Sequence, residues 1–467
     1  MSLSISQPTF WLFIANTALV ITALLHMLYQ RRAPQSLMAW LLTIILLPYI
    51  GAFIYFIFGL RKSLNKRYKP KIAMQSISET APQNHLANQL NHILCANNIA
   101  GTTCHNTTTI YQTDSESYQQ FMYLIENAQS HIHLETYIFE HDKTGKTILK
   151  ALINKAKQGV QIRLLMDSIG SFKLYLNQQP LKALTQAGGS YAFFQPFWPG
   201  IISSQINLRN HRKIYLFDQK TLLTGGMNLS NDYLGTANQN EPKRWIDLMF
   251  EIQGPTTFHY QNIFNEDWHY TTKEKLSNPA LPDYPVQPTG EIIQVVPSGP
   301  DIKTDALFET LLNSIYQANA HIQIATPYFI PNSAIMNALL IALKRGVNVT
   351  LLTPETSDHL IFDLGRSSYM RDLSEAGGKV YYYTDSMLHS KLIIIDQLAA
   401  VIGSANFDYR SLFINYEIVN FIYSEPLIQN LSQWFYTQLN ESVSYQPSPA
   451  RGRVIFENMT RIITPIL

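Results

Sequence analysis

The chain has 467 residues, which is too long for one ordinary domain and indicates two or three. Apolar residues make up 46% of the sequence and charged residues 15%. This charged share is below the roughly 25% of soluble domains, so part of the chain is expected outside water. The net charge of +2 disfavours a general binder of polyanions, and two cysteines are too few for a disulfide framework or a four-thiolate zinc site.

Two apolar stretches lie near the N-terminus. Residues 9–29 carry no charge except a possible one on His26, and residues 37–60 carry none. Each is longer than the roughly 18–20 residues that a helix needs to cross a bilayer. We therefore predict a two-helix transmembrane hairpin over residues 1–60. The alternatives are a buried core helix or a cleaved signal peptide, and the uncharged residues 1–9 disfavour the signal peptide.

Basic residues flank the second stretch. The loop between the stretches holds Arg31 and Arg32, and six basic residues with no acidic one follow the second stretch: Arg61, Lys62, Lys66, Arg67, Lys69 and Lys71. The positive-inside rule then places the large C-terminal part in the cytoplasm. The same cluster would attract anionic lipid headgroups. We assign residues 61–105 to a basic, structure-poor linker.

From about residue 106 the sequence repeats itself. Residues 130–139 resemble residues 320–329, residues 157–162 resemble residues 344–349, and residues 187–189 match residues 376–378. A nearly constant offset between the two copies indicates a duplicated domain. We place the first half at residues 106–285 and the second at residues 286–467.

Each half shows the same succession of expected elements. Residues 131–139 and 322–329 are typical of strands, residues 148–158 and 335–344 of helices that end at a glycine, and residues 160–166 and 347–352 of strands. This alternation predicts an α/β fold with a largely parallel, buried sheet. We expect two tandem α/β halves with pseudo-twofold symmetry, preceded by the two-helix hairpin.

The most specific pattern lies late in each half. Both halves match H-x-K-x4-D-x6-G-[GS]-x-N, once with His211, Lys213, Asp218 and Asn228, and once with His389, Lys391, Asp396, Ser404 and Asn406. Residues two apart in a strand project to the same face, so each His and Lys should point together. If the halves meet, these side chains surround one pocket.

Such a pocket suits a phosphate diester. Lysines and amides can stabilise its oxygens, whose negative charge grows in the transition state. One imidazole can attack phosphorus while the other protonates the leaving oxygen. We predict no metal and no cofactor.

The duplicated motif resembles that of the phospholipase D superfamily. The wider sequence is similar to its bacterial cardiolipin synthases over nearly the whole chain, including the hairpin and residues 209–213, 296–300, 326–331, 410–411 and 461–467. The resemblance implies the PLD-like fold and transfer of a phosphatidyl group through an enzyme histidine to a second phosphatidylglycerol, with release of glycerol. It implies His211 as nucleophile and His389 as acid and base. It also implies phosphatidylglycerol as donor and acceptor, and a multi-pass position in the bacterial inner membrane.

Two carboxylates resemble the family residues that accept a hydrogen bond from a histidine ring and fix its tautomer, Asp247 and Glu417. Surface salt bridges are the alternative. Around Asp247 the chain departs from the family, because Ile246 stands where an Arg is usual and Met249 where a His is usual.

The motif aspartates Asp218 and Asp396 lie an odd number of residues from their histidines. Alternation puts them on the other strand face, as structural or charge-balancing partners, although the family pattern groups them with the active site.

Arg209 lies two residues before His211, whereas Met387 holds the same position in the second half. Our hypothesis is that Arg209 binds the phosphate of the second lipid. An aromatic group lies upstream and either lines an acyl-chain entrance or packs in the core; its members are Tyr191, Phe193, Phe194, Phe197 and Trp198.

Three other functions use the same pattern. A nuclease is disfavoured by the two membrane stretches and the low net charge, so no nucleic acid partner is expected. A lipid hydrolase that makes phosphatidic acid would differ only in using water as acceptor. An inactive scaffold is disfavoured because neither motif has lost a member.

Overall fold

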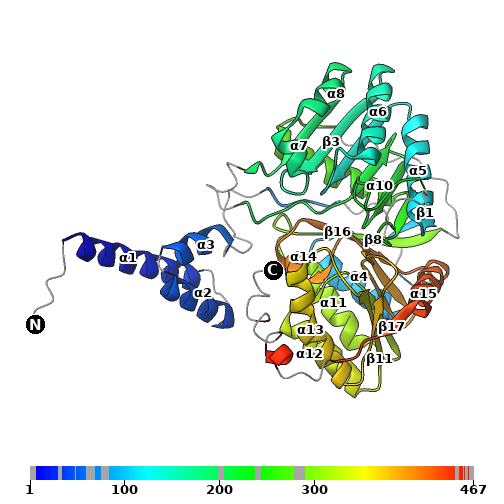
Figure 1. Cartoon of the computed structure of the whole chain (residues 1–467). Helices are drawn as coiled ribbons and strands as arrows, with labels where there is room; N and C mark the ends of the chain where they lie inside the picture. The colour runs from blue at the N-terminus through cyan, green and yellow to red at the C-terminus, as the bar shows by residue number, and fades with distance from the viewer. Residues whose placement is uncertain are drawn as a thin grey trace, which may run out of the picture.

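The computed structural model describes residues 7–29, 34–47, 49–58, 69–74, 82, 84–197, 205–236, 243–277, 290–447, 452–455, 457 and 461. Two α/β halves lie one against the other, and a group of N-terminal helices extends from one side of them (Figure 1).

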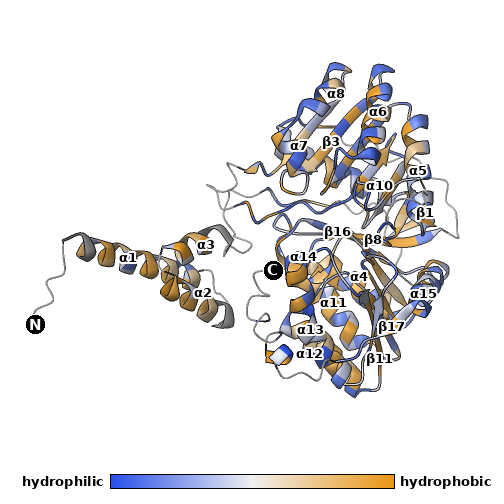
Figure 2. Ribbon diagram, viewed as in Figure 1, coloured by the Kyte–Doolittle hydropathy of each residue, from blue (hydrophilic) through white to orange (hydrophobic). Residues whose placement is uncertain are grey.

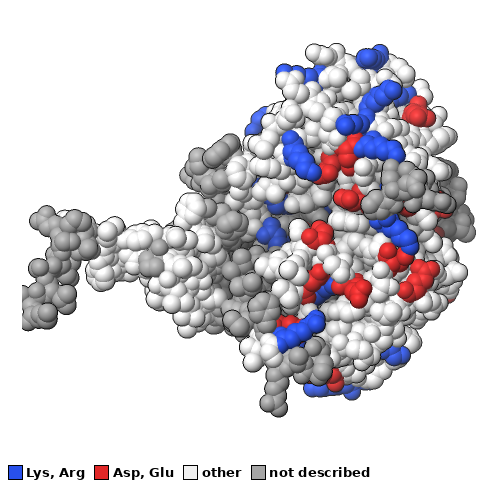
Figure 3. All heavy atoms as spheres, viewed as in Figure 1, with Lys and Arg blue, Asp and Glu red and all other residues white. Residues whose placement is uncertain are grey.

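Three N-terminal helices contain no Asp, Glu, Lys or Arg: α1 (Gln7–Tyr29), α2 (Pro34–Leu46) and α3 (Ile50–Phe58). They are mostly apolar (Figure 2), and no charged side chain is seen on the face of them that Figure 3 shows. Within the described residues, only the helix portion Phe10–Tyr29 is long and apolar enough to cross a membrane.

The predicted second membrane helix, residues 37–60, is not continuous. Helix α2 ends at Leu46 and α3 begins at Ile50, with a left-handed backbone at Tyr49 (φ 65°). Residue 48 is a proline and lies outside the described residues. Proline lacks the N–H that a helix interior requires, which explains the interruption. The two pieces still pack on α1, where His26 Nδ1 lies 2.7 Å from the Tyr55 hydroxyl.

The predicted linker is more ordered than its composition suggests. Helix α4 (His85–Ala96) begins at the cap Asn84 and buries its apolar face against α11 (Ala306–Gln317). Two of the six predicted headgroup-binding cations are instead bound by the α/β halves, since Lys69 is buried against Asp267 and Asp301 and Lys71 donates to the carbonyl oxygens of residues 300 and 302. The other four, and the loop pair Arg31 and Arg32, lie outside the described residues.

One 15-stranded sheet runs through both halves. The first half contributes β1 (Thr103–Tyr111), β2 (His131–Thr136), β3 (Gln161–Asp167), β4 (Ser190–Phe194), β5 (Ile214–Phe217), β6 (Thr221–Gly225) and β7 (Met249–Gln253). The second contributes β8 (Glu291–Ser298), β9 (His321–Ala325), β11 (Asn348–Pro354), β12 (Lys379–Tyr383), β13 (Leu392–Ile395), β14 (Ala399–Gly403), β16 (Glu417–Ile422) and β17 (Ser442–Ser444). A separate parallel pair is formed by β10 (Phe329–Ile330) and β15 (Phe407–Asp408).

The strand order shows the duplication directly. From edge to centre the first half runs β4-β3-β2-β5-β6-β7-β1, and the second runs β12-β11-β9-β13-β14-β16-β8, with β17 added outside β12. Strands β1 and β8 pair antiparallel in the middle. An antiparallel central pair with matching strand orders on both sides is the arrangement that a pseudo-twofold axis produces.

The prediction of a largely parallel sheet is wrong. Within the 15-stranded sheet of the described residues, parallel pairs occur only where a helix crosses over, in β2-β3-β4 and β9-β11-β12. The motif strands instead form tight hairpins, β5 with β6 and β13 with β14. Asp218 and Asp396 begin the two turns with left-handed backbones (φ 52° in each), and the following glutamines are left-handed too. The sheet is therefore mixed.

Helices cover both faces of the sheet. On one face, α10 (Thr256–Thr272) and α15 (Glu425–Asn440) share a core with strands of both halves. On the other face the first half has α5 (Asp114–Asn127), α6 (Lys143–Lys157) and α8 (Lys182–Gln186), and the second has α4, α11, α12 (Ser333–Lys344) and α13 (Leu360–Glu375). Two short helices, α7 (Phe172–Leu176) and α14 (Tyr409–Phe413), lie near strand ends.

Candidate active site

The backbones of the two halves meet at the two motif histidines. The His211 amide donates to the Tyr416 carbonyl (2.8 Å), and the Tyr416 amide donates to the Arg209 carbonyl (2.9 Å). The same arrangement recurs on the other side, where the His389 amide donates to the Ile246 carbonyl (2.7 Å). The backbone at each histidine is thus hydrogen-bonded to the opposite half, in addition to the contacts that its side chain makes.

Each histidine is also oriented by a carboxylate from the opposite half. His211 Nδ1 lies 3.0 Å from Glu417 Oε2, and His389 Nδ1 lies 2.8 Å from Asp247 Oδ2. All four side chains are buried. A carboxylate on Nδ1 leaves Nε2 as the nitrogen that faces a ligand. Both supporting carboxylates therefore lie where they can fix a histidine tautomer.

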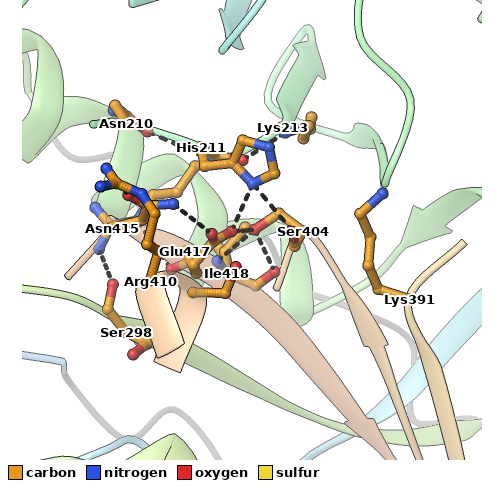
Figure 4. Close-up of polar contacts among 12 residues, drawn as sticks. Asn210, His211, Lys213, Ser298, Lys391, Ser404, Arg410, Asn415, Glu417 and Ile418 are labelled. Carbon is orange, nitrogen blue, oxygen red and sulfur yellow. Dashed lines mark hydrogen bonds and ion pairs between the residues drawn. The ribbon is translucent and has the colours of Figure 1, made fainter. Parts of the chain in front are cut away.

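Ser404 completes the surroundings of His211. Its carbonyl oxygen lies 3.1 Å from His211 Nδ1, and its hydroxyl donates to Glu417 Oε2 (2.5 Å). Figure 4 shows His211 above Glu417 and Ser404, with Lys391 reaching up on the other side of the ring. The first half has Gly226 at this position, where a Cβ would lie 2.2 Å from Asp247 Oδ2. Only a glycine leaves room for Asp247 there.

Burial sets the protonation of the central groups. It lowers the pKa of His211, although Glu417 opposes the shift, and it lowers the pKa of His389 well below its usual value with the help of Lys391. Burial raises the pKa of Asp247 to about 6, because Lys391 only partly offsets it. For Glu417 burial acts in the same direction, but the contacts with His211, the charge of Lys213 and the Ser404 hydroxyl together outweigh it, and the pKa is lowered.

The motif lysines lie directly behind their histidines. Lys213 Nζ donates to the His211 carbonyl oxygen (2.8 Å), and Lys391 Nζ donates to the His389 carbonyl oxygen. Both side chains are buried, and burial lowers the pKa of each, that of Lys213 to about 7. Both ammonium groups thus lie next to the histidines and are enclosed by protein.

The histidines open onto one cavity of about 580 Å³, which Asn228 and Asn406 also line. Asn406 Oδ1 is buried and has no hydrogen-bond partner among the described residues. Asn228 Oδ1 accepts from the Ile138 amide (3.3 Å). The structure therefore brings the two His and two Asn of the motifs to one cavity, as the sequence predicts.

The motif aspartates are not part of this cavity. Asp218 accepts from the amides of residues 129, 130 and 131, and Asp396 accepts from those of residues 319, 320 and 321. These amides begin β2 and β9, at the strand ends remote from the histidines. The catalytic grouping of Asp218 and Asp396 is thus corrected in favour of the structural reading that their odd spacing suggested.

Arg209 lines the cavity, but its guanidinium is already bound by other groups of the protein. Its Nη1 lies 3.3 Å from Asp167 Oδ1 and 3.1 Å from Ser168 Oγ, and Nη2 donates to the Gln205 carbonyl oxygen. The guanidinium charge is therefore balanced within the protein, which does not favour a role in binding a second lipid phosphate. In the aromatic group, Phe193 and Phe194 pack in the core, whereas Phe197 lines the cavity and residue 198 lies outside the described residues.

Several residues around the two histidines give no signal in the sequence pattern. The Tyr233 hydroxyl lies 3.3 Å from His389 Nε2, and Trp245 packs against the same ring. Tyr137 packs edge-on against His211. Arg410, which the resemblance marked only as part of a landmark, lines the cavity from the second half.

A buried ion cluster lies behind His211. Arg212 pairs with Asp267 (2.7 Å) and Asp301 (2.9 Å), and Lys69 pairs with the same two carboxylates (2.6 Å each). Asp267 comes from the first half and Asp301 from the second, while Lys69 follows the N-terminal helices. We call these four residues the ion cluster.

Comparison with known proteins agrees with this arrangement. Residues 121–268 and 311–439 match the family model described as "Cardiolipin synthase, PLD-like domain", and residues 18–59 match that of the phospholipase D-nuclease N-terminal region. The structure of phosphatidylserine synthase from Haemophilus influenzae covers 81% of this chain and is itself covered completely, with a TM-score of 0.59 and 14% identity. The fold is thus that of the phospholipase D superfamily.

Among sequence relatives, cardiolipin synthase 1 of Bacillus cereus is 31% identical over 94% of this chain and 90% of its own length. Cardiolipin synthase of Clostridium perfringens strain 13 is 32% identical over 94% of this chain and 95% of its own length. The chain belongs to the bacterial cardiolipin synthase family. The N-terminal match and the apolar helix indicate that it is associated with a membrane.

Proposed function

We propose that this chain synthesises cardiolipin by transferring a phosphatidyl group from one phosphatidylglycerol to another. One observation carries the proposal: two buried histidines, each held at Nδ1 by a carboxylate of the opposite half, open onto the same cavity. The relatives that bear the name cardiolipin synthase over nearly the whole chain favour this reaction over others of the superfamily.

In the first step, Nε2 of His211 attacks the phosphorus of the donor lipid. The bond from phosphorus to the glycerol oxygen breaks, and His389 gives that oxygen a proton as glycerol leaves. An anionic phosphate in the cavity would raise the pKa of His389, which burial lowers in the free protein, so that the ring can carry this proton. The product is a phosphatidyl group on the His211 nitrogen.

In the second step, a hydroxyl of the second phosphatidylglycerol gives its proton to His389 and attacks the phosphorus. The phosphorus–nitrogen bond breaks, which frees His211 and yields cardiolipin. Lys213 and Lys391 supply positive potential from behind, and the amides of Asn228 and Asn406 are donors for the phosphate oxygens. Asp247 and Glu417 hold the ring orientations throughout.

Hydrolysis to phosphatidic acid is the second candidate, because water could replace the lipid hydroxyl in the second step. It would use the same residues. The outcome depends on whether the acceptor lipid excludes water from the phosphorylated histidine.

We further propose a multi-pass position in the bacterial inner membrane with the catalytic part in the cytoplasm, from the counts of basic residues around the second apolar stretch. The proposed division is a membrane segment at residues 1–60, a connector at 61–105, and catalytic halves at 106–285 and 286–467.

Purified protein in detergent, supplied with phosphatidylglycerol vesicles, tests the reaction. Mass spectrometry should find cardiolipin and glycerol in equal amounts, and His211→Ala or His389→Ala should each reduce both by at least about 1000-fold. Phosphatidic acid without cardiolipin would favour hydrolysis. Full activity in either alanine variant would contradict the roles given to the histidines.

A further inference from the structure

The cavity is lined by a cationic residue, Arg410, that the reaction steps above do not use. Arg410 lies on α14, four residues beyond Asn406, and lines the cavity from the second half. Its guanidinium reaches across to the first half, where Nη1 donates to Asn207 Oδ1 (2.6 Å) and Nη2 to the Asn207 carbonyl (3.0 Å). Nη2 also lies 3.3 Å from Asn415 Oδ1. Figure 4 shows Arg410 and Asn415 together on one side of His211, with Lys391 on the other.

These partners leave the guanidinium of Arg410 without a direct ion pair among the described residues. All three are neutral oxygens, and no carboxylate of the described residues lies within ion-pairing distance of this guanidinium. The neighbouring Asp408 accepts from the Ser411 amide (2.8 Å), so that Asp408 and Glu417 attract the guanidinium without contacting it. Arg209, by contrast, is paired with Asp167. Burial lowers the pKa of Arg410, as expected for a cation that is removed from water without an anionic partner.

The pseudo-twofold axis does not reproduce this cation. Arg410 lies seven residues after Gly403, and the residue seven after Gly225 is Asp232. The histidines, lysines and amides of the motifs are therefore paired across the axis, whereas Arg410 has an acid as its counterpart. A symmetric centre with one asymmetric cation fits a reaction that holds one phosphate at the centre and a second phosphate on one side only.

We propose that Arg410, positioned by Asn207 and Asn415, binds the phosphate of the acceptor lipid. This inference rests on the proposed function and adds a place for the second substrate. A guanidinium offers several N–H groups in one plane and can hold two oxygens of a phosphate diester at once. With its phosphate fixed at Arg410, the acceptor lipid can direct its glycerol hydroxyl to the phosphorus on the histidine.

Two reactions of the same enzyme separate this role from a general one. Cardiolipin formation needs an acceptor that carries a phosphate. Exchange of labelled free glycerol into phosphatidylglycerol passes through the same phosphohistidine but uses an acceptor without a phosphate. Arg410→Gln should lose cardiolipin formation about 10- to 100-fold more than it loses exchange, as expected for one charged hydrogen-bonding partner. Arg410→Lys keeps the charge but not the planar fork. Its ratio of cardiolipin formation to exchange should lie between those of the wild type and Arg410→Gln.

The matched control is Arg345→Gln. Arg345 also donates to backbone carbonyl oxygens, of residues 315 and 318, but lies at the end of α12 away from the cavity. It should keep the wild-type ratio of the two reactions. The exchange reaction itself reports whether a variant is folded.

Several outcomes would overturn the inference. Equal loss of both reactions in Arg410→Gln, no loss in either, or a larger selective loss in Arg209→Gln would each remove the acceptor site from Arg410. If the wild type shows neither exchange nor cardiolipin formation, the proposed function fails as well.

Discussion

The two histidines have carboxylate partners of different character. Glu417 accepts from the Ser404 hydroxyl as well as contacting His211, and its pKa is lowered. In the part of the chain that the structure describes, no hydroxyl donates to Asp247, because Gly226 takes the place of the serine, and burial raises its pKa to about 6. One histidine is thus held by a firmly ionised carboxylate, and the other by a carboxylate that titrates near neutral pH.

This difference predicts a bell-shaped pH profile for kcat/KM in glycerol exchange. Below a pH of about 6, Asp247 is protonated and cannot accept from the Nδ1–H of His389, so the rate should rise through that value. Above a pH of about 7, Lys213 becomes neutral in the free enzyme and attracts phosphate less, so the rate should fall.

The variant Lys213→Arg checks the second limb. Arginine stays charged over the whole range, so the fall in rate should move to higher pH even if the maximum rate is lower. An unchanged alkaline limb in this variant would show that another group controls it.

The sequence predicted the residues that carry the chemistry better than their surroundings. The spacing of His211 and His389 with their lysines and amides was sufficient to place them together, because strand alternation and duplication both follow from local pattern. The contacts of Asp247 with His389 and of Glu417 with His211, each between the two halves, were not predictable. They depend on how two strand ends meet. The same holds for Tyr233 and Arg410, which no repeated motif marks.

At the level of elements, the site is built from two hairpins whose strand ends face each other. In each hairpin, the His and Lys precede the first strand, an aspartate at the turn fixes the far end, and the Gly-[GS]-x-Asn segment follows the second strand. The hairpins are equivalent except at the small residue after the second strand. Ser404 occupies that position in one and Gly226 in the other.

Making the two hairpins alike should damage the site. In Gly226→Ser the new Cβ would lie 2.2 Å from Asp247 Oδ2, so the carboxylate must move away from His389. We expect kcat for exchange to fall at least about tenfold, with far-ultraviolet circular dichroism unchanged. Gly452→Ser is the matched control, because no atom of the described residues lies within 4 Å of a Cβ at that position. Wild-type kcat in Gly226→Ser would show that Asp247 does not need its present position.

The halves join into one sheet through β1 and β8, which lie between them in Figure 1. The site lies where the backbone at each motif histidine is hydrogen-bonded to the opposite half. Duplication in the sequence predicted two similar halves and their symmetry. It did not predict the continuous sheet, because pairing of two edge strands leaves no local pattern. The second membrane stretch was misread as one helix, since composition and length alone do not register the break between α2 and α3.

At the scale of the molecule, the ion cluster connects three parts of the chain. Lys69→Met would leave Asp267 and Asp301 with Arg212 as their only cation in the cluster, in a region with essentially no solvent access. Removing one partner of a buried pair typically costs about 3–5 kcal/mol, so the catalytic part should melt at a lower temperature. Lys173→Met, at a side chain that is 83% exposed, should melt as the wild type does. Identical melting of both variants would contradict a stabilising role for Lys69.

The ion cluster also bears on where the catalytic part of this protein can be cut. A fragment that begins at α4 contains both PLD-like halves, yet it lacks the lysine that neutralises the interface directly behind His211. Such a fragment would place two carboxylates against one arginine beside the nucleophile, so low activity in it would not demonstrate a need for the bilayer. A fragment that begins just before Lys69 keeps this charge balance, and only with such a fragment can the effect of the membrane on catalysis be separated from damage at the truncation.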